Sequence, residues 1–335
     1  MPHDRTKAAA TIRGRLRTLL GCQGSQADFD EIQAQARQFL GENDTVTLLV
    51  EAAGLMHASR CRPLDESVSA WATLRQRAQA HLPDNDQTLM AIRSHYARFL
   101  RLRGRPSDLD EVIDLRREEV RLRETQLAEG DIFVGIARSD LAVALIDRVR
   151  ARVACHEGQR AGPDPDLVEA MHLIEEEIGR RSMVYAPANS FAQRSAVTRG
   201  ELLVALAESS VGARRADYAG KSLAIADSLI DYFWKESQLS SSSILRCQLN
   251  RAESLTLLGR LEDGARAARQ ACAITAGWSR FTDRGRPLFV LAKAQRELDR
   301  ELSLATASDA LAARRKVFPA DSYRVREVEF FLASA

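Results

Sequence analysis

The chain repeats a pair of short amphipathic helices at intervals of about 40 to 45 residues, and this period constrains its fold more than any other feature. The unit is clearest over residues 246–274. Leu249 and Ala252 belong to an apolar stripe at helical spacing, which predicts a first helix that ends at Gly259. Glu262 opens a second helix, because an acidic side chain stabilises the positive end of the helix dipole. One such pair cannot bury its apolar face alone and must stack on similar pairs.

Small residues mark the repeats, and in five of them the small residue lies seven positions before the turn. These anchor residues are Gly14, Gly54, Ala97, Ala142, Ala207, Ala252, Ala292 and Ala333. Successive anchors lie 40 to 45 residues apart, except for Ala142 and Ala207, which lie 65 apart. We therefore predict about seven helix pairs, irregular repeats over roughly 130–237, and a capping helix over 322–333 at the C-terminal end.

The composition favours an all-α fold. Aromatic residues make up only 6% of the chain and prolines number nine. No long stretch alternates apolar and polar residues, as the strands of a sheet would. The predicted helices span 4–20, 27–40, 44–59, 64–81, 86–103, 109–127, 132–155, 165–181, 190–209, 213–235, 241–258, 262–275, 283–298, 301–318 and 322–333.

Charge and cysteine content narrow the function classes. The net charge is +2, so no strong field attracts nucleic acid or a membrane surface. Only five of the 48 basic residues are lysines, which indicates a GC-rich, bacterial genome. The five cysteines are scattered and form no CxxC pair, so we expect free thiols rather than a zinc site or a disulfide framework. The N-terminus is polar and no apolar run reaches 18 residues, which predicts a cytoplasmic protein without a membrane span.

The repeat junctions resemble those of tetratricopeptide repeats of the long-helix, kinesin light chain type. Pro83 and Pro319 each lie 14 residues before an anchor, and Leu-Ala pairs such as 141–142 and 291–292 occur in the first helices. The resemblance implies a right-handed superhelical solenoid of antiparallel helix pairs that runs through 1–335 as a single domain. HEAT or armadillo repeats share the period and are the structural alternative. The glycine and aspartate turns and the small residues of the second helices favour the tetratricopeptide arrangement.

No catalytic or cofactor signature occurs in the chain. The GxxxxGK[ST], GxGxxG, HExxH and GxSxG motifs are absent. His57, His95 and His172 lie singly in predicted helices. Cys155 and His156 are neighbours in the sequence, but adjacent helical residues do not face each other. We therefore predict no enzymatic activity, no cofactor and no metal site.

The resemblance also implies that the first helices line a concave face that meets the partner. Arg98 and Arg101 form a basic stripe there, which is either a carboxylate or phosphate patch or a solvated face. Neighbouring aromatic residues are out of phase with this stripe, which argues against nucleic acid. The predicted partner-binding residues are Glu51, Ser94, Arg98, Arg101, Asp140, Asn250, Glu253, Lys293 and Arg296.

Three functions are compatible with this sequence. The prediction is a non-catalytic scaffold whose concave face binds a protein or peptide. The first alternative is a regulatory sensor that responds to a ligand or peptide and controls an effector on a separate polypeptide. The second alternative is an enzyme built on the repeat fold, which no sequence motif supports.

Overall fold

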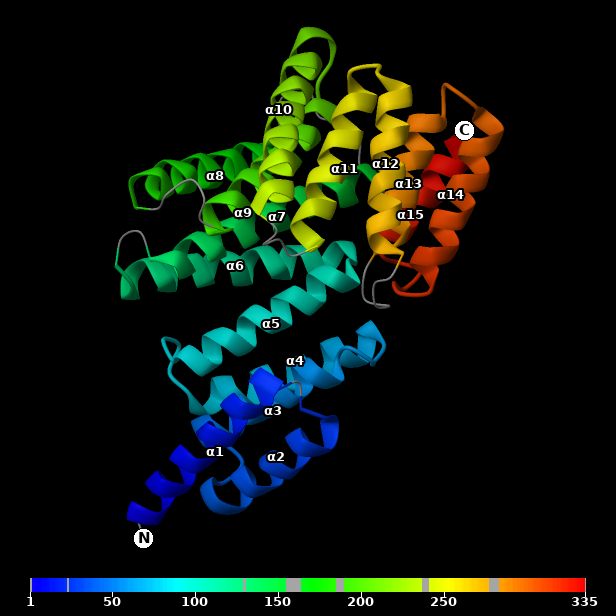
Figure 1. Ribbon diagram of the computed structural model, residues 1–335. Helices are drawn as coiled ribbons and strands as arrows, with labels where there is room; N and C mark the ends of the chain where they lie inside the picture. The colour runs from blue at the N-terminus through cyan, green and yellow to red at the C-terminus, as the bar shows by residue number, and fades with distance from the viewer. Residues whose placement is uncertain are drawn as a thin grey trace. The chain divides into compact units, whose positions relative to one another are not determined.

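The computed structural model describes residues 2–22, 24–128, 131–154, 164–184, 190–236, 241–276 and 283–334. These residues form fifteen α-helices and contain no strand (Figure 1). The predicted all-α class is therefore confirmed. The chain divides into two compact units, Met1–Arg103 and Gly104–Ala335, here called the N-terminal and C-terminal units. Their boundary falls between the helices predicted over 86–103 and 109–127, and the single continuous solenoid stays a prediction.

The N-terminal unit contains five helices and begins with a three-helix core. Ser25 starts the second helix with a reciprocal cap, because its side chain and the Asp28 carboxylate accept hydrogen bonds from each other's backbone N–H. Phe29 and Ile32 of that helix pack between its two neighbours. The bounds are α1 Pro2–Cys22, α2 Gln26–Leu40, α3 Thr45–Ala58, α4 Leu64–His81 and α5 Gln87–Arg103.

Helices α4 and α5 pack together around one tryptophan. The Trp71 side chain is fully buried. Its ring stacks on Phe99 with the centroids 5.9 Å apart and lies 5.2 Å from the ring of His95. His95 therefore has a packing role, as does His57, whose ring lies 5.2 Å from that of Phe29.

The C-terminal unit contains the other ten helices. Each helix packs on the next along the chain. In addition, α7 contacts α9, α9 contacts α11, and α11 contacts α13. The bounds are α6 Pro106–Gln126, α7 Ile132–Ala154, α8 Pro165–Val184, α9 Ser190–Glu208, α10 Gly212–Glu236, α11 Ser241–Leu257, α12 Leu261–Thr275, α13 Gly285–Gln295, α14 Arg300–Arg315 and α15 Tyr323–Ser334.

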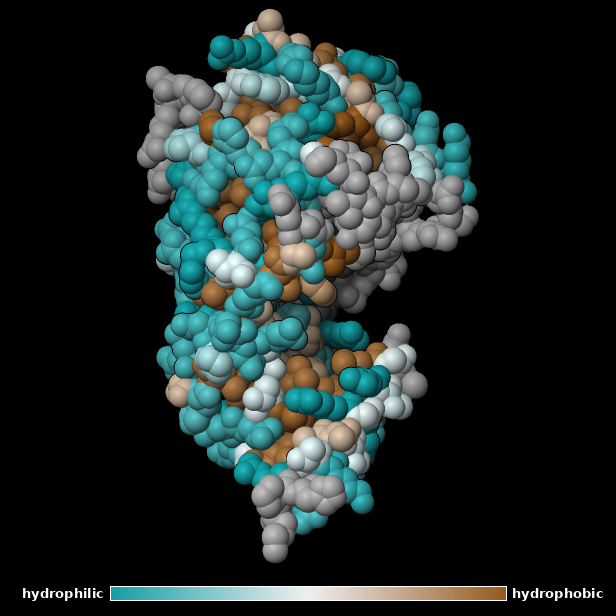
Figure 2. Space-filling view, turned by 90° about the vertical axis from the view of Figure 1, so that its left-hand side faces the viewer, coloured by the Kyte–Doolittle hydropathy of each residue, from teal (hydrophilic) through white to brown (hydrophobic). Residues whose placement is uncertain are grey.

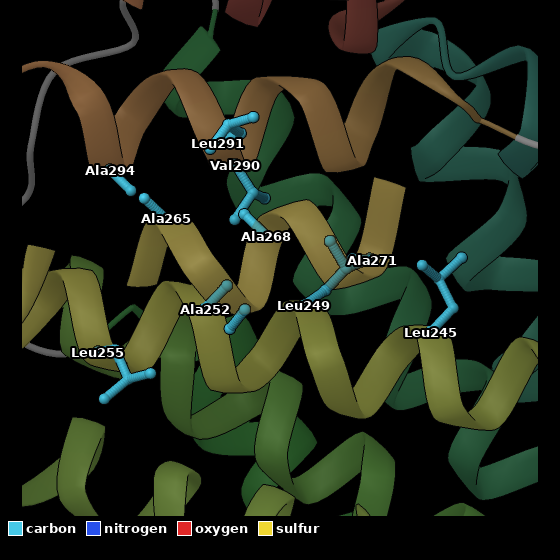
Figure 3. Packing of buried hydrophobic residues seen from close by; sticks show 11 residues of the cluster. Leu245, Leu249, Ala252, Leu255, Ala265, Ala268, Ala271, Val290, Leu291 and Ala294 are labelled. Carbon is cyan, nitrogen blue, oxygen red and sulfur yellow. The ribbon is translucent and has the colours of Figure 1, made fainter. Parts of the chain in front are cut away.

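Small side chains let these helices approach closely. Figure 3 shows the core between α11, α12 and α13, where Ala252, Ala265 and Ala268 lie among leucines and a valine. All three alanines are buried. An amphipathic helix with alanine on its inner face can pack on both neighbours, which is the requirement of a stacked repeat. Apolar side chains show between polar ones on the surface of the molecule (Figure 2).

The last helix of the C-terminal unit packs against the beginning of the same unit. Helix α15 packs on α14 and also against α7. The Tyr323 N–H donates to the Gly104 carbonyl at 2.9 Å, and Arg105 Nε lies 2.8 Å from Asp321 Oδ2. Arg324 Nη2 donates to Asp147 at 3.3 Å. We call these three contacts the C-terminal clasp. They go beyond the neighbour-only contacts expected of a solenoid end.

Replacement of Gly104 by alanine is expected to loosen this clasp. Gly104 has a φ of +70°, and an added Cβ would clash with the guanidinium of Arg324 and lie 3.0 Å from Ser322 Oγ and 3.2 Å from Tyr323 Cδ1. Because a left-handed residue with a Cβ costs about 1–2 kcal/mol, Gly104→Ala should lower the free energy of unfolding in urea by about that amount. Gly179→Ala is the control, since nothing lies within 4 Å of its added Cβ. Equal stability of the Gly104→Ala and wild-type proteins would contradict the role of the clasp.

The predicted helices agree with the structure in number and nearly in extent, with a few corrections. Helix α6 starts at Pro106 rather than at residue 109, because proline suits the first helical position. Arg105 precedes it, and its backbone N–H donates to the Asp108 carboxylate. Cys155 and His156 lie outside the described residues. None of the described helices combines the length and the apolar character that a bilayer crossing requires.

Candidate functional site

Alternate helices of the C-terminal unit bring charged side chains to one place. Helices α7, α9, α11 and α13 lie side by side, and α15 returns to α7 (Figure 1). Charged residues recur on them at a spacing of seven, as in Glu201 and Glu208 of α9, which puts both on one helix face. The central charged cluster, as we call it, consists of Asp147, Arg150, Glu201, Glu208, Arg246, Glu253, Arg286, Lys293, Arg324 and Glu327.

Glu253 of α11 is the acidic centre of this cluster. Its side chain is only 6% exposed. Arg286 Nη2 donates to Glu253 Oε2 at 3.2 Å, and Lys293 Nζ donates to Oε1 at 3.4 Å, both from α13. Burial acts to raise the pKa of Glu253, but the positive charges of Arg286, Lys293 and Arg150 outweigh it and hold the pKa well below its usual range. The carboxylate is therefore ionised at neutral pH.

Glu201 of α9 and Arg246 of α11 form a second ionic pair. Arg246 Nε and Nη2 donate to the two carboxylate oxygens at 2.8 and 2.9 Å, which is a two-pronged match. Nη2 also donates to Thr198 Oγ1 at 3.0 Å. Burial acts to raise the pKa of Glu201, but Arg246, Arg286 and Arg150 outweigh it and lower the pKa to about 2.

Helices α13 and α15 supply further ionic contacts. Lys293 Nζ also donates to Glu208 at 3.0 Å, and its charge lies 5.5 Å from the centre of the Phe289 ring. Behind the cluster, the buried Arg314 of α14 donates to Glu327 at 2.6 Å and to Asp283 at 3.2 Å. These bonds anchor α15 and the start of α13 to α14.

The low pKa of Glu201 predicts loss of stability in acid. Below about pH 4.5 the Glu201 carboxyl is protonated in the unfolded chain but stays ionised in the folded chain. The stabilisation that the ionised carboxylate provides is therefore lost as the pH falls towards 2. The Glu201→Gln variant should be less stable than wild type at pH 6, and this difference should shrink at pH 4 and again at pH 3. Urea unfolding at the three pH values measures it. A difference that stays constant would contradict the ionic role of Glu201.

Three of the predicted partner-binding residues meet in or beside the cluster. Glu253 and Lys293 are members, and Asn250 lies on the same side of α11. Asn250 is buried, and its Nδ2 donates to the Val197 carbonyl at 3.2 Å. Its Oδ1 is buried without a hydrogen-bond partner among the described residues.

The other predicted partner-binding residues lie elsewhere. Arg296 donates to the Ser334 carbonyl at 2.8 Å, at the far end of α13. Asp140 of α7 accepts from Arg194 at 2.7 Å. Four more belong to the N-terminal unit: Glu51 pairs with Arg37 and Arg77, Arg98 is exposed, and Ser94 and Arg101 are half-buried. The structure therefore brings three of the nine together.

Several cluster members escaped the sequence analysis although a signal was present. A spacing of seven between charged residues repeats on successive first helices, as in Arg246 and Glu253 and in Arg286 and Lys293. A stripe of charged residues on a helix face that is otherwise apolar indicates a polar site inside the protein. Arg324 carries no comparable signal, because only the return of α15 to α7 brings it to Asp147.

The cysteines of the described ranges differ in exposure. Cys247 is buried and burial raises the pKa of its thiol to about 12, so it remains protonated and unreactive. Cys61 is exposed and Cys272 is partly buried. The part of the chain that the structure describes holds no group of three His, Cys, Asp or Glu side chains that could bind a metal ion.

Comparison with known proteins places the fold. The chain matches no protein-family model and no curated protein sequence. It is similar in structure to a Rap protein solved in complex with competence and sporulation factor, with a TM-score of 0.61 and 11% identity over 94% of this chain and 77% of the Rap chain.

Two further solved structures are similar at lower scores. One is BtubC from P. vanneervenii, with a TM-score of 0.48 and 15% identity, covering 76% of this chain and 91% of the other. The other is a variant of the nearly identical TPR-like repeats of a putative kinesin light chain from Podosopora anserina, with a TM-score of 0.44 and 15% identity, covering 70% and 98%. Stacked antiparallel helix pairs and the similarity to the Rap protein lead to one conclusion: the chain is a helical-repeat protein with the tetratricopeptide-type fold.

Proposed function

We propose that the chain is a non-catalytic scaffold that binds a peptide or an extended segment of a partner protein on the inner side of its C-terminal unit. The first support is the accessibility of the central charged cluster. Lys293 and Arg246 form ion pairs but remain accessible to solvent, since their side chains are 29% and 28% exposed. Polar groups that are held in place and still reach solvent can bind a ligand at little cost in ordering.

The observation that carries the proposal is a pair of unmet polar atoms on α11 and α7, two of the helices that carry the cluster. Asn250 Oδ1 is a buried acceptor, and Arg150 Nη2 is a buried donor, and neither has a hydrogen-bond partner among the described residues. Burial of an unpaired polar group costs about 1–3 kcal/mol, so such groups call for an explanation. A peptide backbone offers both N–H donors and carbonyl acceptors. The Rap protein of the same fold, solved with its factor, is a precedent for a ligand on such a scaffold.

A mixed-sequence hexapeptide pool tests this function. The full chain is incubated with the pool and separated by gel filtration, and the retained peptides are identified by mass spectrometry. We expect the wild-type chain and Arg266→Gln to retain a defined subset. Arg266 is the matched control because it lies 66% exposed on the outer helix α12. Asn250→Ala should retain several-fold less. No retention by wild type, or equal retention by Asn250→Ala, would reject the proposal.

A ligand-responsive sensor is the second candidate, and the C-terminal clasp favours it. The contacts of Gly104, Arg105 and Asp147 with the start of α15 join the two ends of the unit that holds the cluster. A ligand that spreads α7 from α13 would therefore act on the clasp. Hydrogen exchange of α15 with and without the retained peptides tests this idea, and unchanged exchange would count against the sensor.

A further inference from the structure

Two exposed helix faces in different units of the chain carry opposite charges at the same spacing. Each holds two charged residues four positions apart and an apolar residue three positions further on, and such residues share one helix face. The basic row, as we call it, lies on α1 and consists of Arg13, Arg17 and Leu20. The acidic row lies on α10 and consists of Asp227, Asp231 and Trp234.

The basic row faces solvent and lacks a counter-charge. Arg13 and Arg17 are exposed, and neither makes an ion pair or a hydrogen bond with another described residue. The exposed residues of α1 over 6–21 include no acid. Leu20 is 61% exposed. Helix α1 packs on α2 and α3 through its other side, where Ile12 and Leu16 are buried, so the basic row is left open.

The acidic row is its counterpart on the C-terminal unit. Asp231 is exposed and makes no ion pair or hydrogen bond with another described residue. Asp227 lies 2.8 Å from Arg251 Nε and remains 49% exposed. The Trp234 side chain is 70% exposed. Tryptophan is enriched among the residues that contribute most to protein–protein binding, so an exposed indole beside unpaired charge indicates a contact surface.

Short side chains accompany both rows. Ala10 and Ala224 each lie three positions before the first charged residue of a row and are exposed. Gly14 and Gly220 lie beside the rows, and a Cβ added at either would meet nothing within 4 Å. Because glycine inside a helix is less stable than alanine, and the packing of this chain requires neither glycine, close approach of a second helix accounts for them.

We propose that the basic row of one copy of this chain binds the acidic row of a second copy. With the two helices side by side and parallel, the equal spacing sets each arginine against an aspartate and Leu20 against the indole of Trp234. An anionic membrane would match the basic row and leave the acidic row unexplained. Exposed ion pairs are individually weak and are screened by salt, so the association should be reversible and salt-sensitive.

Sedimentation velocity of the full chain at rising protein concentration is the first measurement. In low salt, about 50 mM, the mean mass of the wild-type chain should rise above that of one copy. In about 500 mM salt the affinity should fall by about tenfold or more, because the Debye length shortens to a few Å. Trp234→Ala should weaken the association by a similar factor, as expected for an aromatic anchor.

Exchange of the charges between the rows identifies the contact. The double variants Arg13→Glu with Arg17→Glu, and Asp227→Arg with Asp231→Arg, should each stay monomeric, because each sets like charges against one another. An equimolar mixture of the two should associate again, since every contact between the variants regains opposite charges. A misfolded surface would not recover in this way.

The matched control reverses two charges on α12. Arg266 and Arg269 are both exposed there, and Arg266→Glu with Arg269→Glu should associate like wild type. Three results would each overturn the proposal: a wild-type chain that stays monomeric at every concentration in low salt, association that survives both reversals, and a mixture that stays monomeric. The proposed binding of peptides is tested separately and is unaffected by any of them.

Discussion

Replacement of Glu253 by glutamine is expected to lower the free energy of unfolding of the C-terminal unit by about 3 kcal/mol. The substitution keeps the size of the side chain and removes the charge that faces Arg286 at 3.2 Å and Lys293 at 3.4 Å. Loss of one partner from a buried ionic group costs about 3–5 kcal/mol, because the remaining charges stay buried without compensation. The lower end applies here, since Arg286 and Lys293 are 22% and 29% exposed and water screens part of their charge.

Urea unfolding followed by labelling of Cys247 measures this effect within the C-terminal unit. The thiol is buried in the folded protein, and its peptide can be followed by mass spectrometry while Cys61 labels at once. Asp309→Ala is the control, because Asp309 is exposed in the middle of α14. Such a surface change should stay within about 0.5 kcal/mol of wild type. An equally small effect of Glu253→Gln would mean that the cluster is solvated and contributes nothing to stability.

The helices could be predicted because local signals define their ends. Helix α4 spans Leu64–His81 as predicted, between Pro63 at its start and an extended Leu82. Gly259 has a φ of +74° and ends the hairpin turn after α11, as its position indicated. Where a signal was weak the prediction was wrong by a few residues. Gly21 does not stop α1, which runs on to Cys22, because Gly21 does not adopt the left-handed conformation that ends a helix.

The association of distant helices could not be predicted in the same way. The division into two units falls between α5 and α6, although their sequences read as one hairpin with a glycine turn. The contact of α15 with α7 joins residues 177 positions apart, as the pair Arg324–Asp147 shows. A periodic pattern indicates which face of a helix is buried and leaves open which other helix covers it. The seven-residue charge spacing is present in the sequence but did not enter the prediction, whereas the pairing of Arg324 with Asp147 became visible only through the fold.

Replacement of Trp71 by alanine is expected to destabilise the N-terminal unit by about 3–5 kcal/mol, the range for removal of a large buried aromatic side chain. Trp71 is fully buried and stacks on Phe99 across the α4–α5 interface. Its Nε1 has no hydrogen-bond partner among the described residues, so the loss is one of packing. The cavity left by the indole is too large for a neighbouring side chain to fill, so α4 should separate from α5.

Hydrogen exchange resolved by peptide is the measurement, because it follows each unit separately. Peptides from α4 and α5 should lose protection in Trp71→Ala. Peptides from α11 and α12 should keep theirs, since the core around Leu249, Ala252 and Ala268 belongs to the C-terminal unit alone. Phe39→Ala provides the matched control, as Phe39 is an aromatic residue of the same unit that is 55% exposed. Equal loss of protection in both units would show that the chain unfolds as one cooperative body. The two cores would then be thermodynamically coupled, as strong interfaces between neighbouring repeats of a single solenoid would make them.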